Sequence, residues 1–309
     1  MQPEVFSGTE QGFRVVGLRT ATAELAMVPE LGGRVVSLRS RRSAREWCWH
    51  RPETRWLWRS EPGSDFGASP QAGIDECVPS VAACSWRRRA VPDHGEVWFQ
   101  NWSLDAAELA AARLTATVDL TITPLRFRRS ISATAEGFRF DYAVTNLGAG
   151  SEEYVWCVHP LFTIEDGDRI ELPAEVTTLR VNGGIGTRPI AHGETWRYPE
   201  PESGFRLDRL ETPGMPRGCI KGFAGPLREG RAALANERTG ARLELRWDVA
   251  AAPLLGVWLN RGHAGIHHVA LEPTNGAPDS LAQAVNEWKQ FGTLAPGATA
   301  TWWLEWRLV

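Results

Sequence analysis

The chain has 309 residues, of which 43% are hydrophobic and 23% charged, as in an ordinary soluble globular protein. A formal net charge of −3, without a Lys/Arg run or a membrane-length apolar stretch, argues against nucleic-acid and membrane partners. The first residues lack the basic and apolar regions of a signal peptide, and five cysteines without a C-x-x-C pair or zinc spacing favour a reducing cytoplasm.

Alternation of hydrophobic and polar residues predicts β-strands along most of the chain. The expected strands lie at 13–18, 23–28, 35–38, 46–49, 102–104, 114–123, 127–133, 138–145, 154–158, 243–249 and 302–308. Residues 60–75 are rich in Gly, Pro, Ser and Asp and predict a long loop, and only 280–290 has much helix-forming content. Many short strands without a β–α alternation predict one all-β domain over residues 1–309, built as a sandwich of antiparallel sheets.

The stretch from Val155 to Phe162 places one histidine, His159, at the end of an apolar run. The preceding strand, 138–145, alternates strictly, and the chain returns after a Gly-rich turn as a second predicted strand. Pro160 cannot donate to a sheet ladder, so we expect His159 at a strand end that faces a rim or cleft. A lone histidine in such a place is more often buried and bonded to the backbone.

Three further polar clusters could carry chemistry. They are Asp75-Glu76, Asp93-His94-Gly95-Glu96 and Leu271-Glu272-Pro273-Thr274. Glu272 follows the apolar run 269–271, and a carboxylate hemmed by apolar neighbours is disposed to a raised pKa. A His and a Glu that face one cavity form an acid/base pair, whereas an isolated carboxylate is usually a solvated surface group.

Three motifs, in order and in rough spacing, resemble those of the aldose 1-epimerase (galactose mutarotase-like) family. They are Pro92-Asp93-His94-Gly95-Glu96, Trp156-Cys157-Val158-His159-Pro160-Leu161-Phe162 and Val269-Ala270-Leu271-Glu272-Pro273-Thr274, and 28–35 is similar to the family's opening strand and turn. The resemblance covers nearly the whole chain and implies a β-supersandwich with an open cleft for a sugar substrate.

The same resemblance implies a mechanism. Glu272 would take the proton from the anomeric hydroxyl, and His159 would protonate the ring oxygen. The ring would open, the C1–C2 bond would rotate, and the ring would reclose on its other face. His94 would hydrogen-bond the oxygen on which charge develops. Both half-reactions are proton transfers, so no metal or organic cofactor is expected.

Five residues are predicted to contact the sugar: Glu76, Asp93, Lys221, Trp98 and Trp258. Where the family carries an arginine and an aspartate, this chain has Asp75-Glu76-Cys77 and Cys219-Ile220-Lys221. If Lys221 points inward it would favour an anionic substituent, unless Glu76 pairs with it. Both tryptophans lie beside motif strands and either stack on the sugar or belong to the core.

Two other functions remain open from the sequence. One is a non-catalytic carbohydrate-binding protein that keeps the cleft without turnover. The other is a related enzyme acting on a uronate or a phosphosugar. The presence of His94, His159 and Glu272 together favours catalysis, because sugar binding alone needs no acid/base pair.

Overall fold

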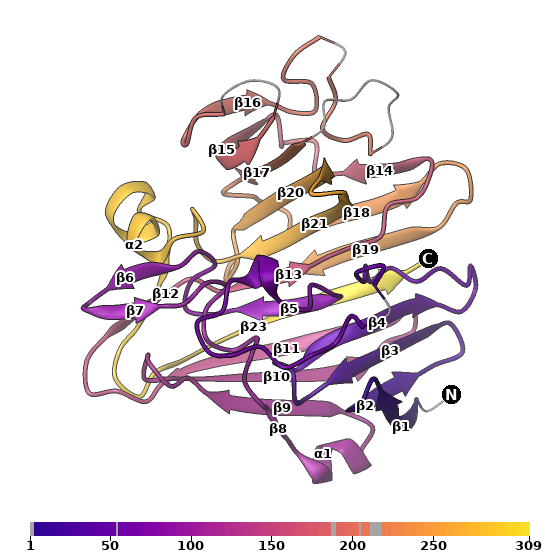
Figure 1. The fold of residues 1–309 in the computed structure, drawn as a ribbon, viewed down its shortest axis with the longest axis vertical. Coiled ribbons are helices and arrows are strands. Elements are labelled where there is room, and N and C mark those ends of the chain that lie inside the picture. The colour runs from indigo at the N-terminus through magenta and orange to yellow at the C-terminus, as the bar shows by residue number, and fades with distance from the viewer. Residues whose placement is uncertain (1–2, 54, 187–189, 204, 211–217) are drawn as a thin grey trace.

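The computed structural model describes residues 3–53, 55–186, 190–203, 205–210 and 218–309. Within these ranges two large antiparallel sheets pack face to face (Figure 1). The larger sheet has eleven described strands in the order β1 (Glu4–Glu10), β2 (Phe13–Arg19), β3 (Ala23–Val28), β4 (Arg34–Ser40), β5 (Ile74–Cys77), β13 (Cys157–Pro160), β21 (Ile266–Thr274), β20 (Leu254–His263), β17 (Gly218–Ala224), β15 (Thr178–Ile185) and β16 (Thr195–Arg197).

The smaller sheet has eight described strands and covers one face of the larger sheet. Their order is β14 (Asp168–Glu171), β18 (Arg231–Asn236), β19 (Arg242–Trp247), β23 (Thr299–Leu308), β11 (Gly137–Asn146), β10 (Leu125–Ala133), β9 (Leu114–Asp119) and β8 (Ser103–Leu104). Two further two-stranded sheets are present: β12 (Glu152–Tyr154) pairs with β22 (Gly292–Leu294), which is distant in sequence, and β6 (Cys84–Trp86) forms a hairpin with β7 (Arg89–Val91). The helical elements are short: η1 (Phe66–Ala68), α1 (Ala106–Ala110), α2 (Leu281–Gln283) and the π-helical turn η2 (Ala284–Trp288).

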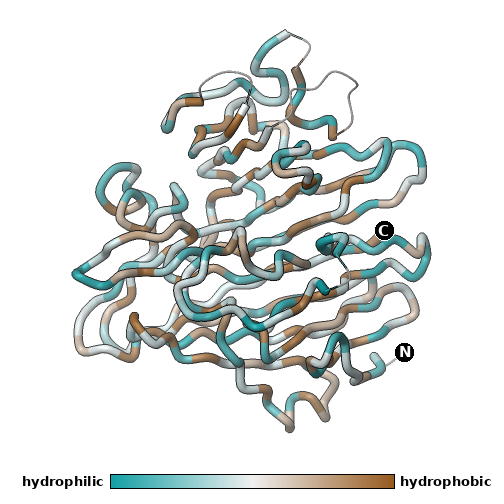
Figure 2. Tube along the Cα trace, viewed as in Figure 1, coloured by the Kyte–Doolittle hydropathy of each residue, from teal (hydrophilic) through white to brown (hydrophobic). Residues whose placement is uncertain are grey.

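The core lies between the two sheets, because each strand turns every second side chain inward. Figure 2 shows the resulting alternation of hydrophobic and hydrophilic residues along the strands. Aromatic rings fill much of this space; Tyr142 stacks on Trp302 with centroids 5.5 Å apart, and Trp156 lies 4.7 Å from the same ring. The predicted all-β class with antiparallel sheets is confirmed. No described helix is long and apolar enough to cross a bilayer.

The expected return strand over 154–158 is wrong in one respect. It is two strands in different sheets, β12 and β13, which separate at Val155 and Trp156. The amide of Trp156 donates to the side chain of Asn275 (2.6 Å) and its carbonyl accepts from Thr274 Oγ1 (2.7 Å). These side-chain bonds supplement a backbone bond from the amide of Asn275 to the same carbonyl (3.2 Å), and β13 enters the larger sheet between β5 and β21.

The predicted strand over 46–49 is also absent as a strand. This segment makes single bridges instead, including Cys48 to Phe162. The predicted helical stretch 280–290 contains α2 and η2, which begin after Ser280 caps the amide of Gln283.

Candidate active site

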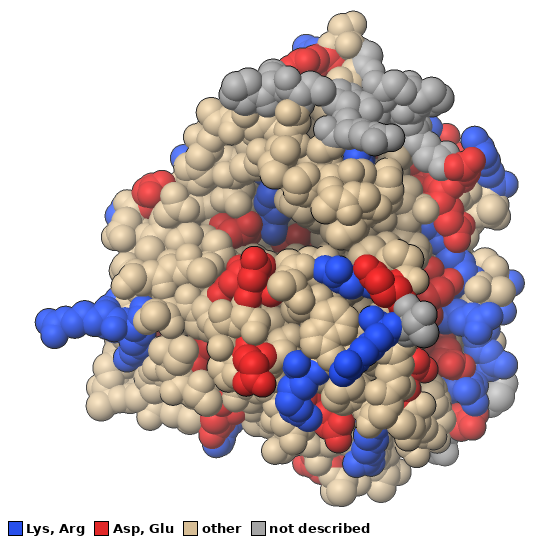
Figure 3. Space-filling model, viewed as in Figure 1, with Lys and Arg blue, Asp and Glu red and all other residues tan. Residues whose placement is uncertain are grey.

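A cavity of about 560 Å³ opens on the face of the larger sheet that the smaller sheet leaves uncovered. Its walls include His94, His159, Lys221, Trp258, Glu272 and Asp279. Figure 3 shows a hollow near the centre of this face, with acidic and basic atoms side by side within it. The strands beneath it are neighbours in the order β13, β21, β20, β17 and β15.

Strand periodicity explains why the polar residues share this face. On β21, Val269 and Leu271 belong to the core, so Glu272 turns the other way. On β13, Val158 belongs to the core and His159 faces the cavity. The two strands are adjacent, so the alternation of each sequence brings the carboxylate and the imidazole together.

The two carboxylate oxygens of Glu272 have different surroundings. Oε2 accepts from Lys221 Nζ and from Cys157 Sγ, the latter at 3.3 Å. Oε1 has no hydrogen-bond partner among the described residues and lies 3.9 Å from His159 Nε2. Burial raises the pKa of Glu272 above its usual value, and the ammonium of Lys221 opposes this shift.

His159 is buried between Phe66, His94 and Glu272. Its ring lies edge-on to His94, with centroids 4.8 Å apart, and its Nδ1 has no hydrogen-bond partner within the described part of the chain. Burial, reinforced by the positive charges that His94 and Lys221 can carry, lowers the pKa of His159 well below its usual value.

His94 is held from two sides. Its Nδ1 lies 2.9 Å from the carboxylate of Asp93, and its ring stacks on Phe66 with centroids 3.9 Å apart. Asp93 also accepts from the amide of Phe66 at 2.9 Å. Burial would raise the pKa of Asp93, but its bond with His94 lowers it below the usual value. Asp93 thus orients His94, and the two residues line the same cavity.

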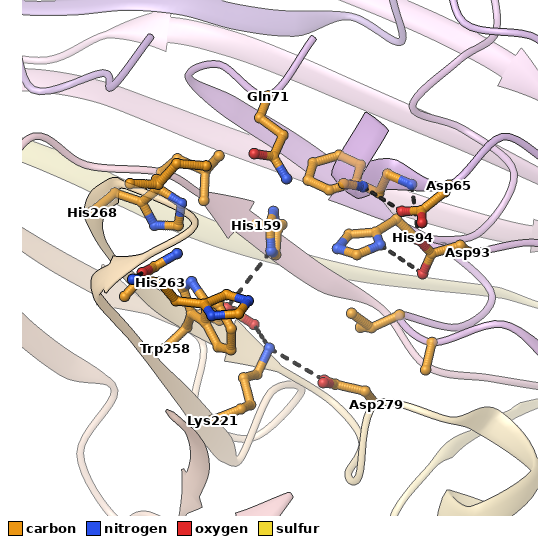
Figure 4. A pocket seen from close by; sticks show the side chains of 18 of the residues that line it. Asp65, Gln71, Asp93, His94, His159, Lys221, Trp258, His263, His268 and Asp279 are labelled. Atoms are coloured by element: carbon orange, nitrogen blue, oxygen red, sulfur yellow. Dashed lines mark hydrogen bonds and ion pairs between the residues drawn. The ribbon is translucent and has the colours of Figure 1, made fainter. Parts of the chain in front are cut away.

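Lys221 points into the cavity and is shared by two carboxylates. Besides Glu272, its ammonium lies 3.2 Å from Asp279, whose other oxygen accepts from Asn182 at 2.8 Å. Figure 4 shows Lys221 between Asp279 and the side chain that contacts His159. Burial alone would lower the pKa of Lys221, but the charges of Asp279 and Glu272 raise it above its usual value.

The loop that carries Asp279 is bonded to the loop that positions His94. The carbonyl of Asp279 accepts from the amides of Val81 and Ala82, both at 2.9 Å. The carbonyl of Val81 in turn accepts from the amide of His94 at 2.6 Å. Segments almost 200 residues apart in sequence therefore fix each other at the rim of the cavity.

Trp258 and His268 form the opposite wall, as Figure 4 shows. Their ring centroids are 6.5 Å apart, and His268 also meets Trp49 edge-on at 5.0 Å. Burial lowers the pKa of His268 to about 4. Trp258 thus lines the cavity, and its contact with a sugar stays a prediction.

Two of the residues predicted to contact substrate lie elsewhere. Glu76 faces the core, because it lies opposite Val158 in the sheet register, whereas Asp75 lies opposite His159. Its carboxylate accepts from Arg129 (3.0 Å) and Trp156 Nε1 (2.9 Å), not from Lys221. Burial raises the pKa of Glu76 to about 7 against the opposing charge of Arg129.

Trp98 is the second correction. It is buried behind Phe66, with ring centroids 5.2 Å apart, and its Nε1 donates to the carbonyl of Asp93 at 2.9 Å. It supports the turn that carries His94 from behind and does not line the cavity.

Several lining residues were missed by the sequence analysis: Arg51, Phe66, Asn182, Asn260, His268 and Asp279. His268 could have been found, because it has the same strand parity as Glu272. Asp279 lies just after the C-terminal motif. Phe66 lies in the predicted loop, where no periodicity indicates side-chain direction. Within the described ranges, no three His, Cys, Asp or Glu side chains are arranged to hold a metal ion.

No protein-family model matches the chain, and no curated protein matches it. Solved structures do. A galactose mutarotase-like protein from Lactobacillus casei is 18% identical with a TM-score of 0.66, over 96% of this chain and 100% of its own. Another from Clostridium acetobutylicum is 14% identical with a TM-score of 0.69, over 100% and 99%.

A protein of Escherichia coli K12 that carries the provisional name aldose 1-epimerase is 17% identical, with a TM-score of 0.64 over 99% of both chains. The three alignments cover 96–100% of this chain. At identities of 14–18% they show a shared fold and do not show a shared activity. The protein has the galactose mutarotase-like fold.

Proposed function

We propose that the protein is an aldose 1-epimerase, which interconverts the α and β anomers of a sugar by opening and reclosing its ring. The observation that carries this proposal is the pairing of Glu272 Oε1 with His159 Nε2, 3.9 Å apart on the wall of one cavity. Within the described residues, Glu272 Oε1 has no hydrogen-bond partner, and the charged group nearest to His159 Nε2 is this carboxylate. Both are left to exchange protons with a bound molecule.

The reaction needs a single proton on this pair. With the proton on His159, Glu272 takes the hydrogen of the anomeric hydroxyl, the C1–O5 bond breaks, and O5 receives the proton of His159. With the proton on Glu272, the same steps run with the roles exchanged. Either way the pair begins and ends with one proton, so charge is conserved through ring opening.

The pKa shifts support efficient transfer. The raised pKa of Glu272 makes its carboxylate a stronger base than a solvated one, and the lowered pKa of His159 makes its imidazolium a stronger acid. Burial is the first cause of both shifts, and a sugar that fills the cavity would exclude further water. His94, oriented by Asp93, is placed to hydrogen-bond the oxygen on which charge develops.

A neutral sugar fits the charge of the cavity better than an anionic one. Lys221 does point inward, as an anion site would need, but its ammonium already contacts the carboxylates of Glu272 and Asp279. Those two carboxylates outnumber the one ammonium. The argument from Lys221 for a uronate or a phosphosugar therefore loses its basis.

The test is NMR saturation transfer between the two anomers across a panel of neutral and anionic aldoses. We expect exchange above the spontaneous rate for at least one neutral aldose, and loss of that exchange in His159→Gln. His267→Gln, which alters an exposed histidine on the same sheet, serves as the control. A sugar that binds without accelerated exchange would support a carbohydrate-binding protein instead.

A further inference from the structure

Lys221 reaches Glu272 by crossing the strand between them. Lys221 lies on β17 and Glu272 on β21, and both strands pair with β20. Gly256 of β20 lies directly opposite Glu272. A Cβ at position 256 would lie 3.1 Å from Glu272 Oε2 and 3.2 Å from Lys221 Cε, so the glycine leaves the space in which the two side chains meet.

The contact divides the carboxylate into two unlike oxygens. Oε2 is occupied by Lys221 Nζ and Cys157 Sγ, from strands on either side of Glu272. Oε1 has no hydrogen-bond partner in the described part of the chain and faces His159. With two donors on Oε2, rotation of the carboxylate would break both bonds, so the free oxygen stays directed at the cavity.

The charge around Glu272 is also set by this contact. Glu272 and Asp279 share the single ammonium of Lys221, which gives the three residues a net charge of −1. The other titratable groups that face Glu272 are Cys157 and His159 on β13 and Cys77 on β5. Burial raises the pKa of both thiols, so they are uncharged at neutral pH. Lys221 is then the cation that favours the ionised form of Glu272, because its charge opposes the rise in pKa that burial causes.

We propose that Lys221 is a positioning residue that fixes Glu272 as the base of the pair and His159 as the acid, by binding Oε2 and leaving Oε1 alone to accept the proton. This inference rests on the proposed function, in which either member could start with the proton. Gly256 and Cys157 belong to the same arrangement, Gly256 by leaving room and Cys157 by donating the second bond.

The decisive measurement is direct titration of the Glu272 carboxyl by ¹³C NMR in the free protein, with the signal assigned by its loss in Glu272→Gln. We expect Lys221→Met to raise the pKa of Glu272 by about 1–3 units, the range for removing an opposite charge at this distance. Asp279→Asn should lower the pKa of Glu272, because it removes a negative charge. Two shifts of opposite sign are a signature that a purely structural role would not give.

The pH dependence of kcat/KM on the active sugar gives the second readout. Its acid limb should move to higher pH in Lys221→Met and to lower pH in Asp279→Asn, with activity in Lys221→Met partly recovered at high pH. The proposal would be overturned if the pKa of Glu272 were the same in both variants as in the native protein and only KM changed. If Lys221→Met does not fold, Asp279→Asn, whose side chain lies at the cavity rim, decides alone by the direction of its shift.

The titration needs no substrate, which separates the two proposals. If the native protein exchanges no aldose but the opposite shifts are found, the hold of Lys221 on Glu272 stands and the proposed function fails. If exchange is found but Glu272 titrates alike in all variants, the function stands and the role of Lys221 is refuted.

Discussion

Glu76 and Glu272 are both fully buried glutamates, each paired with a cation, on strands of the same sheet, yet their carboxylates are bonded differently. Both oxygens of Glu76 are bonded, one to Arg129 and one to Trp156. Among the residues that the structure describes, only one oxygen of Glu272 has hydrogen-bond partners, and the other faces a cavity. A buried ion pair that is completely satisfied stabilises the fold, whereas one left half satisfied at a cavity wall is available for chemistry.

The largest effect that would sharpen this contrast is on activity. Glu272→Gln keeps the shape of the side chain and removes the base, so we expect kcat to fall by about 10²–10⁴-fold with little change in the melting temperature. Saturation transfer with the active sugar measures it. Glu305→Gln, on the smaller sheet, is the matched control. Near-normal turnover in Glu272→Gln would break the contrast.

The next effect is on stability. Arg129→Met strands the carboxylate of Glu76 in the core, and loss of one partner of a buried pair costs about 3–5 kcal/mol. Arg126→Met, on the same strand, breaks an exposed pair with Asp119 and should cost about 0–1 kcal/mol. Urea denaturation of both variants compares them. Equal costs would show that Glu76 is not the structural member of the two.

A smaller effect concerns the stability of the fold at acid pH. The pKa of His268 is about 4 in the folded protein and about 6.5 when unfolded, so the unfolded chain binds more protons between these values. Stability should therefore fall as pH drops from 6.5 to 4, by at most about 3 kcal/mol from this group. His268→Gln should flatten that fall, measured as the free energy of unfolding against pH. His267→Gln, an exposed neighbour, should leave the fall as it is.

The smallest effect separates the two predicted sugar-contacting tryptophans. Trp258 lines the cavity and Trp98 does not, so Trp258→Leu should raise KM by about 2–10-fold and remove a ligand-induced change in fluorescence. Trp98→Phe should keep that change. The reverse result would place the sugar against the other wall.

Many of the strands could be predicted from the sequence, because the alternation of hydrophobic and polar residues is strong wherever one face of a strand packs against the core. The strands β11 and β23 follow that pattern closely. The division of 154–158 into two strands was not accessible, since it depends on a side chain from Asn275. A bond of that kind joins distant residues and leaves no local pattern.

The residues of the candidate site could be predicted from the sequence to a similar extent. Glu272, His159 and His94 line one cavity, as their motifs suggested. Glu76 was misplaced because the family resemblance indicates a position in the chain and not the direction of a side chain. Strand parity excludes Glu76 from the cavity, since it is in register with Val158, which belongs to the core. The partners of Lys221 could not be foreseen, because they depend on the order of β17, β20 and β21 in the sheet.

The bonds between the Asp279 loop and the Val81 loop also bear on how the protein folds. Strand β13 has β5 and β21 as its neighbours, and the rim of the cavity joins residues almost 200 positions apart. A chain growing from the ribosome cannot assemble this cavity until the segment through Asp279 has emerged. Such distant pairings slow folding, typically to milliseconds or seconds. Acquisition of ligand binding should therefore be a late event in folding, well after the local hairpins have formed.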